Sequence, residues 1–209
     1  MRERFYRVTR DLHLYLGLFT SPFVLVFAIS VFFLVHSWLP RFAPETSTTR
    51  VVSALPLPGD LQTLSGRALI DALKPTLEKA DVRGEVGFVR HMVKEGKLII
   101  PVTIPGRETT VSLSIASREA SIVTRETGLA DALVTLHKSP GQHVPAIRMN
   151  WLYMKAWRWT ADATVYVVLF ISVSGIYLWY VLRAERTVGF ILLLAGAITF
   201  FGMAYALSH

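Results

Sequence analysis

Long apolar runs alternate with mixed and polar stretches along this chain. The first run, Leu12–Leu39, carries no charge beyond what its two histidines, His13 and His36, provide. The second run, Val165–Leu182, and the third, Val188–Leu207, contain no charged residue. About 20 apolar residues span the ~30 Å hydrocarbon core of a bilayer, so the pattern predicts three transmembrane helices. We place them at residues 12–39, 161–182 and 188–207.

The stretch between the first two helices, residues 40–143, predicts a small α+β domain with linkers. A polar linker, Pro44–Thr49, precedes a helix over Ser65–Ala80, whose leucines recur at a spacing of four. Pro75 predicts a kink or a break in that helix. Alternating apolar and polar residues between turn signals then predict a meander of strands and a final short helix. The expected strands are Glu85–Val93, Lys97–Ile104, Thr109–Ile115 and Ser121–Thr124, and the short helix is Leu129–His137.

Residues 144–160 are rich in tryptophan and basic side chains. Three tryptophans fall within nine residues, at Trp151, Trp157 and Trp159. Indoles mixed with cations are typical of the membrane–water interface, so the segment predicts an interfacial entry into the second span. A stacking platform for single-stranded nucleic acid has a similar composition. The position directly before an apolar span argues against that alternative, and we expect a lipid bilayer rather than a nucleic acid as the partner.

Composition and charge add a topology to this picture. The 209 residues are 52% hydrophobic and carry a formal net charge of +7, with a mean hydropathy of +0.43. Basic residues flank the spans, which favours a cytoplasmic location for residues 1–11 and for the hairpin 183–187. The domain at 40–143 is then periplasmic, in the inner membrane of a Gram-negative bacterium. The inverted topology is the alternative. The orienting residues are Arg2, Arg4, Arg7, Arg10, Arg183 and Arg186.

Motifs for catalysis are missing from the sequence. There is no cysteine, which excludes disulfides, thiolate metal sites, iron–sulfur clusters and covalently attached haem. No zincin, Walker, dinucleotide-binding or nucleophile-elbow pattern occurs. We therefore predict no catalytic residue, and the identity of any bound metal stays open. Asp162, near the start of the second span, is either an intramembrane carboxylate or an ordinary interfacial residue.

Three short motifs resemble the PepSY-associated transmembrane helix family. Leu12–Gly17 resembles the L-H-x-x-x-G start of that family, and Leu136–Gly141 resembles its second L-H motif. Ser174–Trp179 is similar to the S-G-x-x-L-W ending of the following span. The turn Ser117–Ala120 departs from the pattern, because the family usually writes T-G there. The resemblance implies a membrane α-helical protein with three transmembrane helices and a small α+β PepSY-like extracytoplasmic domain.

The resemblance also directs attention to haem b, because some larger members look like haem-containing inner-membrane reductases that act on ferric siderophores. A haem b takes one or two imidazoles as iron ligands. His13 and His36 are 23 residues apart, or ~35 Å along a helix, and so cannot share one haem. His36 and His137 lie on the same outer side in the predicted topology and are our first candidate pair. His13 would pair with its copy in a homo-oligomer or with a partner subunit.

Other interpretations of these residues stay open. Histidines at the ends of spans also serve as interfacial anchors, and His91, His143 and His209 are expected to be ordinary domain, loop and terminal residues.

Two functions follow. One is a small haem b redox protein that passes electrons toward periplasmic ferric iron or a siderophore. The other is a non-enzymatic accessory or regulatory subunit that docks on a larger membrane complex. Small residues along the third span, at Gly189, Gly196 and Gly202, favour close packing within the chain or against a partner.

Overall fold

The structure is a computed structural model that describes residues 2–36, 38, 46–59, 61, 63–139, 147–182 and 185–208. The chain divides into two compact units. One unit comprises residues 1–22 and 163–209, and the other comprises residues 23–162. The border between them therefore falls inside two long helices.

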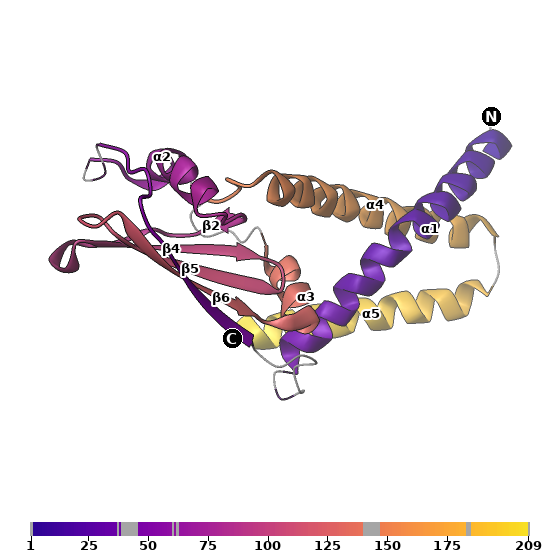
Figure 1. The fold of residues 1–209 in the computed structure, drawn as a ribbon. Coiled ribbons are helices and arrows are strands. Elements are labelled where there is room, and N and C mark those ends of the chain that lie inside the picture. Colours follow the sequence, from indigo (N-terminus) through magenta and orange to yellow (C-terminus); the bar gives the residue numbers. More distant parts are fainter. Residues whose placement is uncertain are drawn as a thin grey trace. The chain divides into compact units, whose positions relative to one another are not determined.

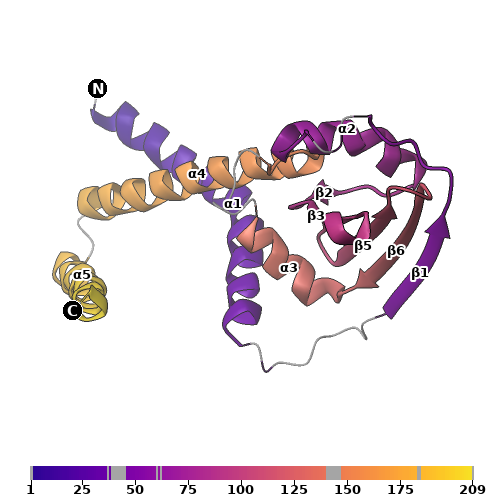
Figure 2. The same cartoon turned by 90° about the vertical axis from the view of Figure 1, so that its left-hand side faces the viewer.

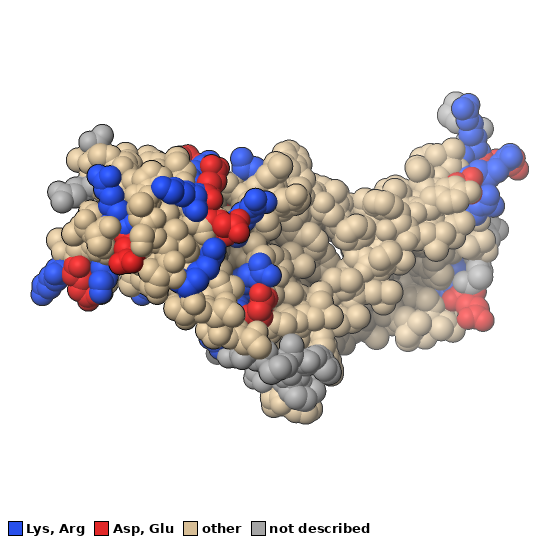
Figure 3. Space-filling model, in the orientation of Figure 1, with Lys and Arg blue, Asp and Glu red and all other residues tan. Residues whose placement is uncertain are grey.

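Three helices are long and apolar enough to cross a membrane, as the sequence predicts. They are α1 (Arg2–Val35), α4 (Leu152–Leu182) and α5 (Arg186–Ser208). The long helices show few charged side chains away from their ends (Figure 3). Two of them begin earlier than the predicted spans, because α1 starts at Arg2 rather than at residue 12, and α4 starts at Leu152 rather than at residue 161. In both helices, polar residues form additional turns on the N-terminal side of the apolar run.

Helix α1 accommodates a proline at position 22 without losing its hydrogen bonding. Pro22 has no backbone N–H, so the Leu18 carbonyl one turn earlier has no helical donor. The Ser21 hydroxyl donates to that carbonyl at 2.9 Å. In hydrocarbon an unbonded carbonyl costs several kcal/mol, which makes this serine a compensation for the proline.

In the unit formed by residues 1–22 and 163–209, α1 and α4 run antiparallel. The Phe5 ring meets Tyr177 edge-on at a centroid distance of 5.4 Å, and His13 reaches Ser174 further along. Helix α5 contacts α4 at Gly189, because a Cβ atom added to Gly189 would overlap the Trp179 indole of α4. Only glycine allows this close approach.

The other unit contains an antiparallel sheet in the order β1-β6-β5-β4-β2, with β3 also paired to β4 (Figure 1). Helix α2 covers the sheet, and α3 follows the last strand. The strands are β1 (Thr46–Val52), β2 (Glu85–Val86), β3 (Arg90–Met92), β4 (Lys97–Ile104), β5 (Arg107–Ser114) and β6 (Glu119–Glu126), with a 3-10 turn η1 (Val93–Glu95). The domain helices are α2 (Gly66–Lys79) and α3 (Gly128–Lys138).

The core of this unit lies between α2 and one face of the sheet (Figure 2). Leu69, Leu73 and Leu77 of α2 are buried, as their spacing of four predicts. Alternate residues of β4, β5 and β6 meet them, because side chains of a strand point to opposite faces in turn. The fully buried members of the sheet are Leu98, Ile100, Val111, Leu113, Ala120 and Ile122.

Three details of the predicted domain are wrong. The strand expected at Glu85–Val93 is split into β2 and β3, because Pro101 on β4 has no N–H for the ladder and Gly87–Val89 bulges opposite it. The supposed linker contributes an edge strand, since Thr46–Val52 pairs along β6. Helix α2 continues through Pro75, so the break, one of the two outcomes expected there, does not occur. The strand at Lys97–Ile104 and the turn at Pro105–Gly106 are confirmed.

The core makes a direct prediction about stability. Leu73 is 0% exposed, so Leu73→Ala removes buried methyl groups and leaves a cavity, at a cost of about 2–5 kcal/mol. Urea unfolding of the full chain in detergent, followed by circular dichroism, measures the loss. Leu129 on α3 is 70% exposed, and Leu129→Ala is the control, with an expected change below about 0.5 kcal/mol. Equal losses in the two variants would contradict the assigned core.

Candidate functional site

Two histidines of the L-H motifs each contact a serine of an apolar helix. In the first unit His13 Nδ1 lies 2.8 Å from the Ser174 hydroxyl. In the second unit His137 Nδ1 lies 2.9 Å from the Ser30 hydroxyl. Ser30 and Ser174 are 2% and 4% exposed, so these bonds form away from water. The two units thus repeat one kind of contact between an imidazole and a buried hydroxyl.

The serine protons determine the tautomer of both imidazoles. A serine hydroxyl has one proton to donate. Ser174 Oγ donates it to the Ile171 carbonyl at 3.2 Å, and Ser30 Oγ donates it to the Phe27 carbonyl at 2.6 Å. With that proton on the helix carbonyl, we infer that the hydroxyl oxygen accepts from the histidine and that Nδ1 carries the ring proton in each case. Nε2 is left with its lone pair, which is the atom that binds a metal or accepts a proton.

The first imidazole lies against a glycine as well as a serine. His13 is half-buried, and an added Cβ at Gly175 would contact its Cε1 atom at 3.4 Å. In the third motif, Ser174 thus supplies the hydrogen-bond partner of the ring. Gly175, which has no side chain, leaves room for the ring. The L-H-x-x-x-G and S-G-x-x-L-W motifs, far apart in sequence, meet in this unit.

The second imidazole is held by three helices. The His137 ring meets the Phe27 ring of α1 edge-on at 5.6 Å between centroids. Phe27 also packs on Trp157 of α4 at 5.8 Å. The Trp157 indole N–H donates to the Leu136 carbonyl, next to the histidine, at 3.0 Å. These contacts fix the end of α3 relative to the adjoining parts of α1 and α4 within this unit.

The structure does not bring His36 to His137. His36 Nδ1 donates to the Phe32 carbonyl of its own helix at 3.0 Å, and its ring packs on Phe32 at 4.5 Å. At 100° per residue, position 36 lies on the opposite side of the helix from Phe27, which faces His137. Within the part of the chain that the structure describes, His36 Nε2 has no hydrogen-bond partner. Their joint role as haem ligands stays a prediction.

The remaining histidines and acids add no further ligand cluster. His91 lies on β3 opposite Leu98, whereas His143 and His209 fall outside the described residues. Asp162 forms an ion pair with Arg158 at 3.7 Å, as expected of an interfacial carboxylate. Within the described ranges no group of three or more histidines, aspartates or glutamates could hold a metal ion.

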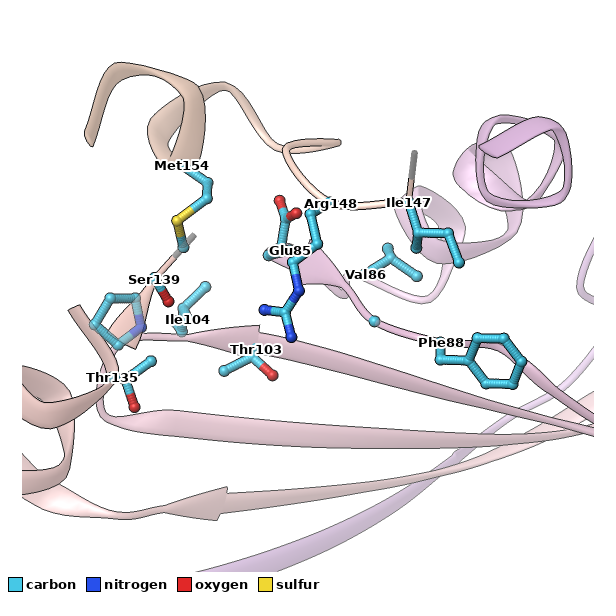
Figure 4. A pocket seen from close by; sticks show the side chains of 12 residues that line it. Glu85, Val86, Phe88, Thr103, Ile104, Thr135, Ser139, Ile147, Arg148 and Met154 are labelled. Atoms are coloured by element: carbon cyan, nitrogen blue, oxygen red, sulfur yellow. The ribbon is translucent and has the colours of Figure 1, made fainter. Parts of the chain in front are cut away.

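A cavity of about 210 Å³ lies beside the sheet, between β2, the end of β4, α3 and the start of α4 (Figure 4). Arg148 extends into it toward Thr103, and Thr135 and Ser139 of α3 add hydroxyls to its wall. Phe88, Ile104 and Met154 supply apolar surface. No sequence pattern indicates this cavity, because its walls come from four separate segments.

One wall of the cavity is formed by a carboxylate that holds the start of α4. Glu85 is 6% exposed and accepts hydrogen bonds from the backbone N–H groups of Met149, Asn150 and Trp151. Asn150 reciprocates, because its side chain donates to the Val86 carbonyl at 2.7 Å and accepts from the Val86 N–H at 2.9 Å. We call Glu85 and Asn150 the strand–helix clamp. A carboxylate at a helix N-terminus is also favoured by the helix dipole.

No family model, curated protein or solved structure matches this chain when its sequence and fold are compared with them. The class of protein is thus defined by the structure: three candidate membrane-spanning helices and a six-stranded antiparallel sheet domain. The resemblance to the PepSY-associated family still rests on its short motifs.

Four residues of these sites were missed by the sequence analysis: Ser30, Ser174, Glu85 and Asn150. A signal for the serines exists, since a lone hydroxyl within an apolar span needs a partner. Ser174 stood in a quoted motif, but nothing in the sequence pairs it with His13. Glu85 and Asn150 are ordinary strand and loop residues until the fold brings them together.

The clamp can be tested by amide hydrogen exchange. Glu85→Ala removes the acceptor of the Met149, Asn150 and Trp151 amides, each a charge-assisted bond worth about 1.5–3 kcal/mol. We expect exchange at these amides to accelerate by about tenfold or more in the full chain in detergent. Glu108, an exposed glutamate on β5, provides the control Glu108→Ala. Unchanged protection at Asn150 and Trp151 in Glu85→Ala would rule the clamp out.

Proposed function

We propose that this chain is a small haem b redox protein of a bacterial inner membrane. The observation that supports it best is the pair of buried imidazole–serine contacts, each of which leaves a histidine Nε2 with a free lone pair. That is the state in which histidine binds iron. The proposal takes its electron-transfer role and its ferric acceptor from the family resemblance.

Two features make His13 and His137 suitable as haem ligands. Ligating histidines commonly donate the proton of the other ring nitrogen to a fixed acceptor, which sets the ring orientation and raises the ligand's basicity. His13 and His137 both do so, through Ser174 and Ser30. Both serines lie in helices that are apolar enough to cross a membrane, which offers the dry surroundings that haem prefers.

Each unit supplies one such imidazole, so His13 and His137 are the residues that would each hold a haem. The second ligand of each haem would come from a second copy of the chain. When bound, haem supplies reversible one-electron transfer. The contribution of the chain is to present Nε2, to hold the ring at a fixed rotation through the serine, and to exclude water from that side of the ring.

The orientation is part of the same proposal. Residues 1–11 lie in the cytoplasm, and the sheet domain lies in the periplasm, where ferric iron or a ferric siderophore would accept the electrons. Basic residues at the start of α1 support this orientation through the positive-inside rule.

A second candidate, an accessory subunit of a larger membrane complex, is favoured by α5. None of the apolar window of this helix is buried by the rest of the described chain. Added Cβ atoms at Gly196 and Gly202 would meet nothing within 4 Å, so these small residues are not used for packing inside the chain. A partner helix would explain them.

The redox proposal predicts a haem spectrum from the purified full chain. Reduced-minus-oxidised spectra should show a Soret shift and an α-band, at a haem content near one per chain. His13→Ala and His137→Ala should each remove the signal of one haem. Ser174→Ala and Ser30→Ala keep the ligand and should weaken haem retention by about 10–100-fold.

His91→Ala is the matched control, because His91 lies on β3 away from both serine contacts. Its haem content should equal that of the parent chain. Purified protein with no Soret or α-band, when expressed with ample haem, would refute the redox proposal and leave the accessory role as the better interpretation.

A further inference from the structure

Basic side chains surround a hollow at the start of α4. The hollow has a volume of about 460 Å³ and is lined by four cations and one carboxylate. The cations come from three segments: Arg67 from α2, Arg148 from the preceding loop, and Lys155 and Arg158 from the first turns of α4. The carboxylate is Asp162. These formal charges sum to +3, so the hollow favours an anion.

Two of the four cations are already paired. Arg67 contacts Asp71 at 3.2 Å, and a hydrogen bond from Lys74 lowers the pKa of Asp71, which keeps that carboxylate ionised. Arg158 contacts Asp162 at 3.7 Å. Arg148 and Lys155 have no carboxylate within ion-pair distance among the residues that the structure describes. Since the Arg148 side chain extends toward Thr103 in the neighbouring cavity (Figure 4), Lys155 is the cation most available to a ligand.

The hollow lies at the depth of lipid headgroups. Helix α4 has 31 residues, or ~46 Å at 1.5 Å per residue, which exceeds the ~30 Å hydrocarbon core by several turns. Residues 165–182 form its uncharged part, so Lys155, Arg158 and Asp162 project above the hydrocarbon. Trp159 lines the same hollow and is 77% exposed, as indoles at the bilayer interface are.

We propose that this hollow binds the phosphate of an anionic phospholipid headgroup. Basic pockets beside membrane helices recognise such headgroups, and each basic residue near the surface contributes to the attraction. Lys155 and Arg158 lie on one side of α4, at a spacing of three. Arg148, from the loop, also lines the hollow, while its side chain extends toward Thr103 (Figure 4). The proposed lipid is thus bound at a defined site of the protein, unlike the bulk lipid around the helix.

Lys155 is the residue that tests the site most clearly. Arg148 also lines the cavity beside Glu85, so its loss affects two places, whereas Lys155 is exposed and lines only the basic hollow. Lys155→Gln removes the charge, and Lys155→Arg keeps it. The matched control is Lys94→Gln with Arg118→Gln, which removes the same two charge types at the opposite end of β4 and β5.

The experiment measures phospholipid binding to the full chain in detergent by native mass spectrometry. Dioleoylphosphatidylglycerol is compared with dioleoylphosphatidylcholine, which has the same chains and no net charge. The parent chain should prefer the anionic lipid. Lys155→Gln should lose about fivefold in affinity for it, and Arg148→Gln with Lys155→Gln should lose no less. Lys155→Arg and the control pair should bind like the parent.

A second arm separates a lipid phosphate from a free one. Inorganic phosphate, added at the same concentration as the anionic lipid, should leave the lipid bound. If inorganic phosphate displaces it, the hollow is a free-phosphate site and the lipid proposal fails. Equal binding of the two lipids, or an equal loss in the control pair, would also overturn it. An unchanged gel-filtration profile of Lys155→Gln shows that the variant is folded.

Discussion

A polar group within the hydrocarbon of a bilayer must find its hydrogen-bond partner inside the protein. This constraint accounts for the main contacts of the long helices. Ser21 donates to the carbonyl left free by Pro22. Ser30 and Ser174 lie within hydrogen-bond distance of both a helix carbonyl and a histidine, and we infer that they donate to the carbonyl and accept from the histidine. The imidazoles are therefore held in one tautomer by the apolar surroundings, and Nε2 is the atom that remains for chemistry.

The sheet domain connects to the second of these histidines through a short series of contacts. The strand–helix clamp ties β2 to the start of α4. One turn or more further along α4, Trp157 donates to the Leu136 carbonyl at the end of α3, and His137 follows directly. A change in the domain that loosens Glu85 would thus reach the ring held by Ser30. The cations of the same first turns of α4 line the basic hollow, so one helix start contributes to the domain, to the histidine contacts and to the proposed lipid site.

The sequence predicts the parts of this fold whose periodicity is strong, and it fails where the partners are distant. Three spans, α2 and β4 follow from apolar runs, leucines at a spacing of four and turn residues. Strand β1 was missed because Thr46–Val52 is mostly exposed and has no alternation. The break between β2 and β3 depends on Pro101 in a neighbouring strand. The histidines were recognised by their motifs, whereas their serine partners lie 107 and 161 residues away in sequence.

The central claim is that serine holds His13 and His137 with a protonated Nδ1 and a free Nε2. Nitrogen-15 NMR of the full chain, labelled at histidine, in lipid nanodiscs at neutral pH and without added haem, measures this state directly. The account predicts Nδ1–H tautomers for both rings, and a loss of that preference in Ser174→Ala for His13 and in Ser30→Ala for His137. Nε2–H tautomers or imidazolium signals for these two residues in the parent chain would contradict it.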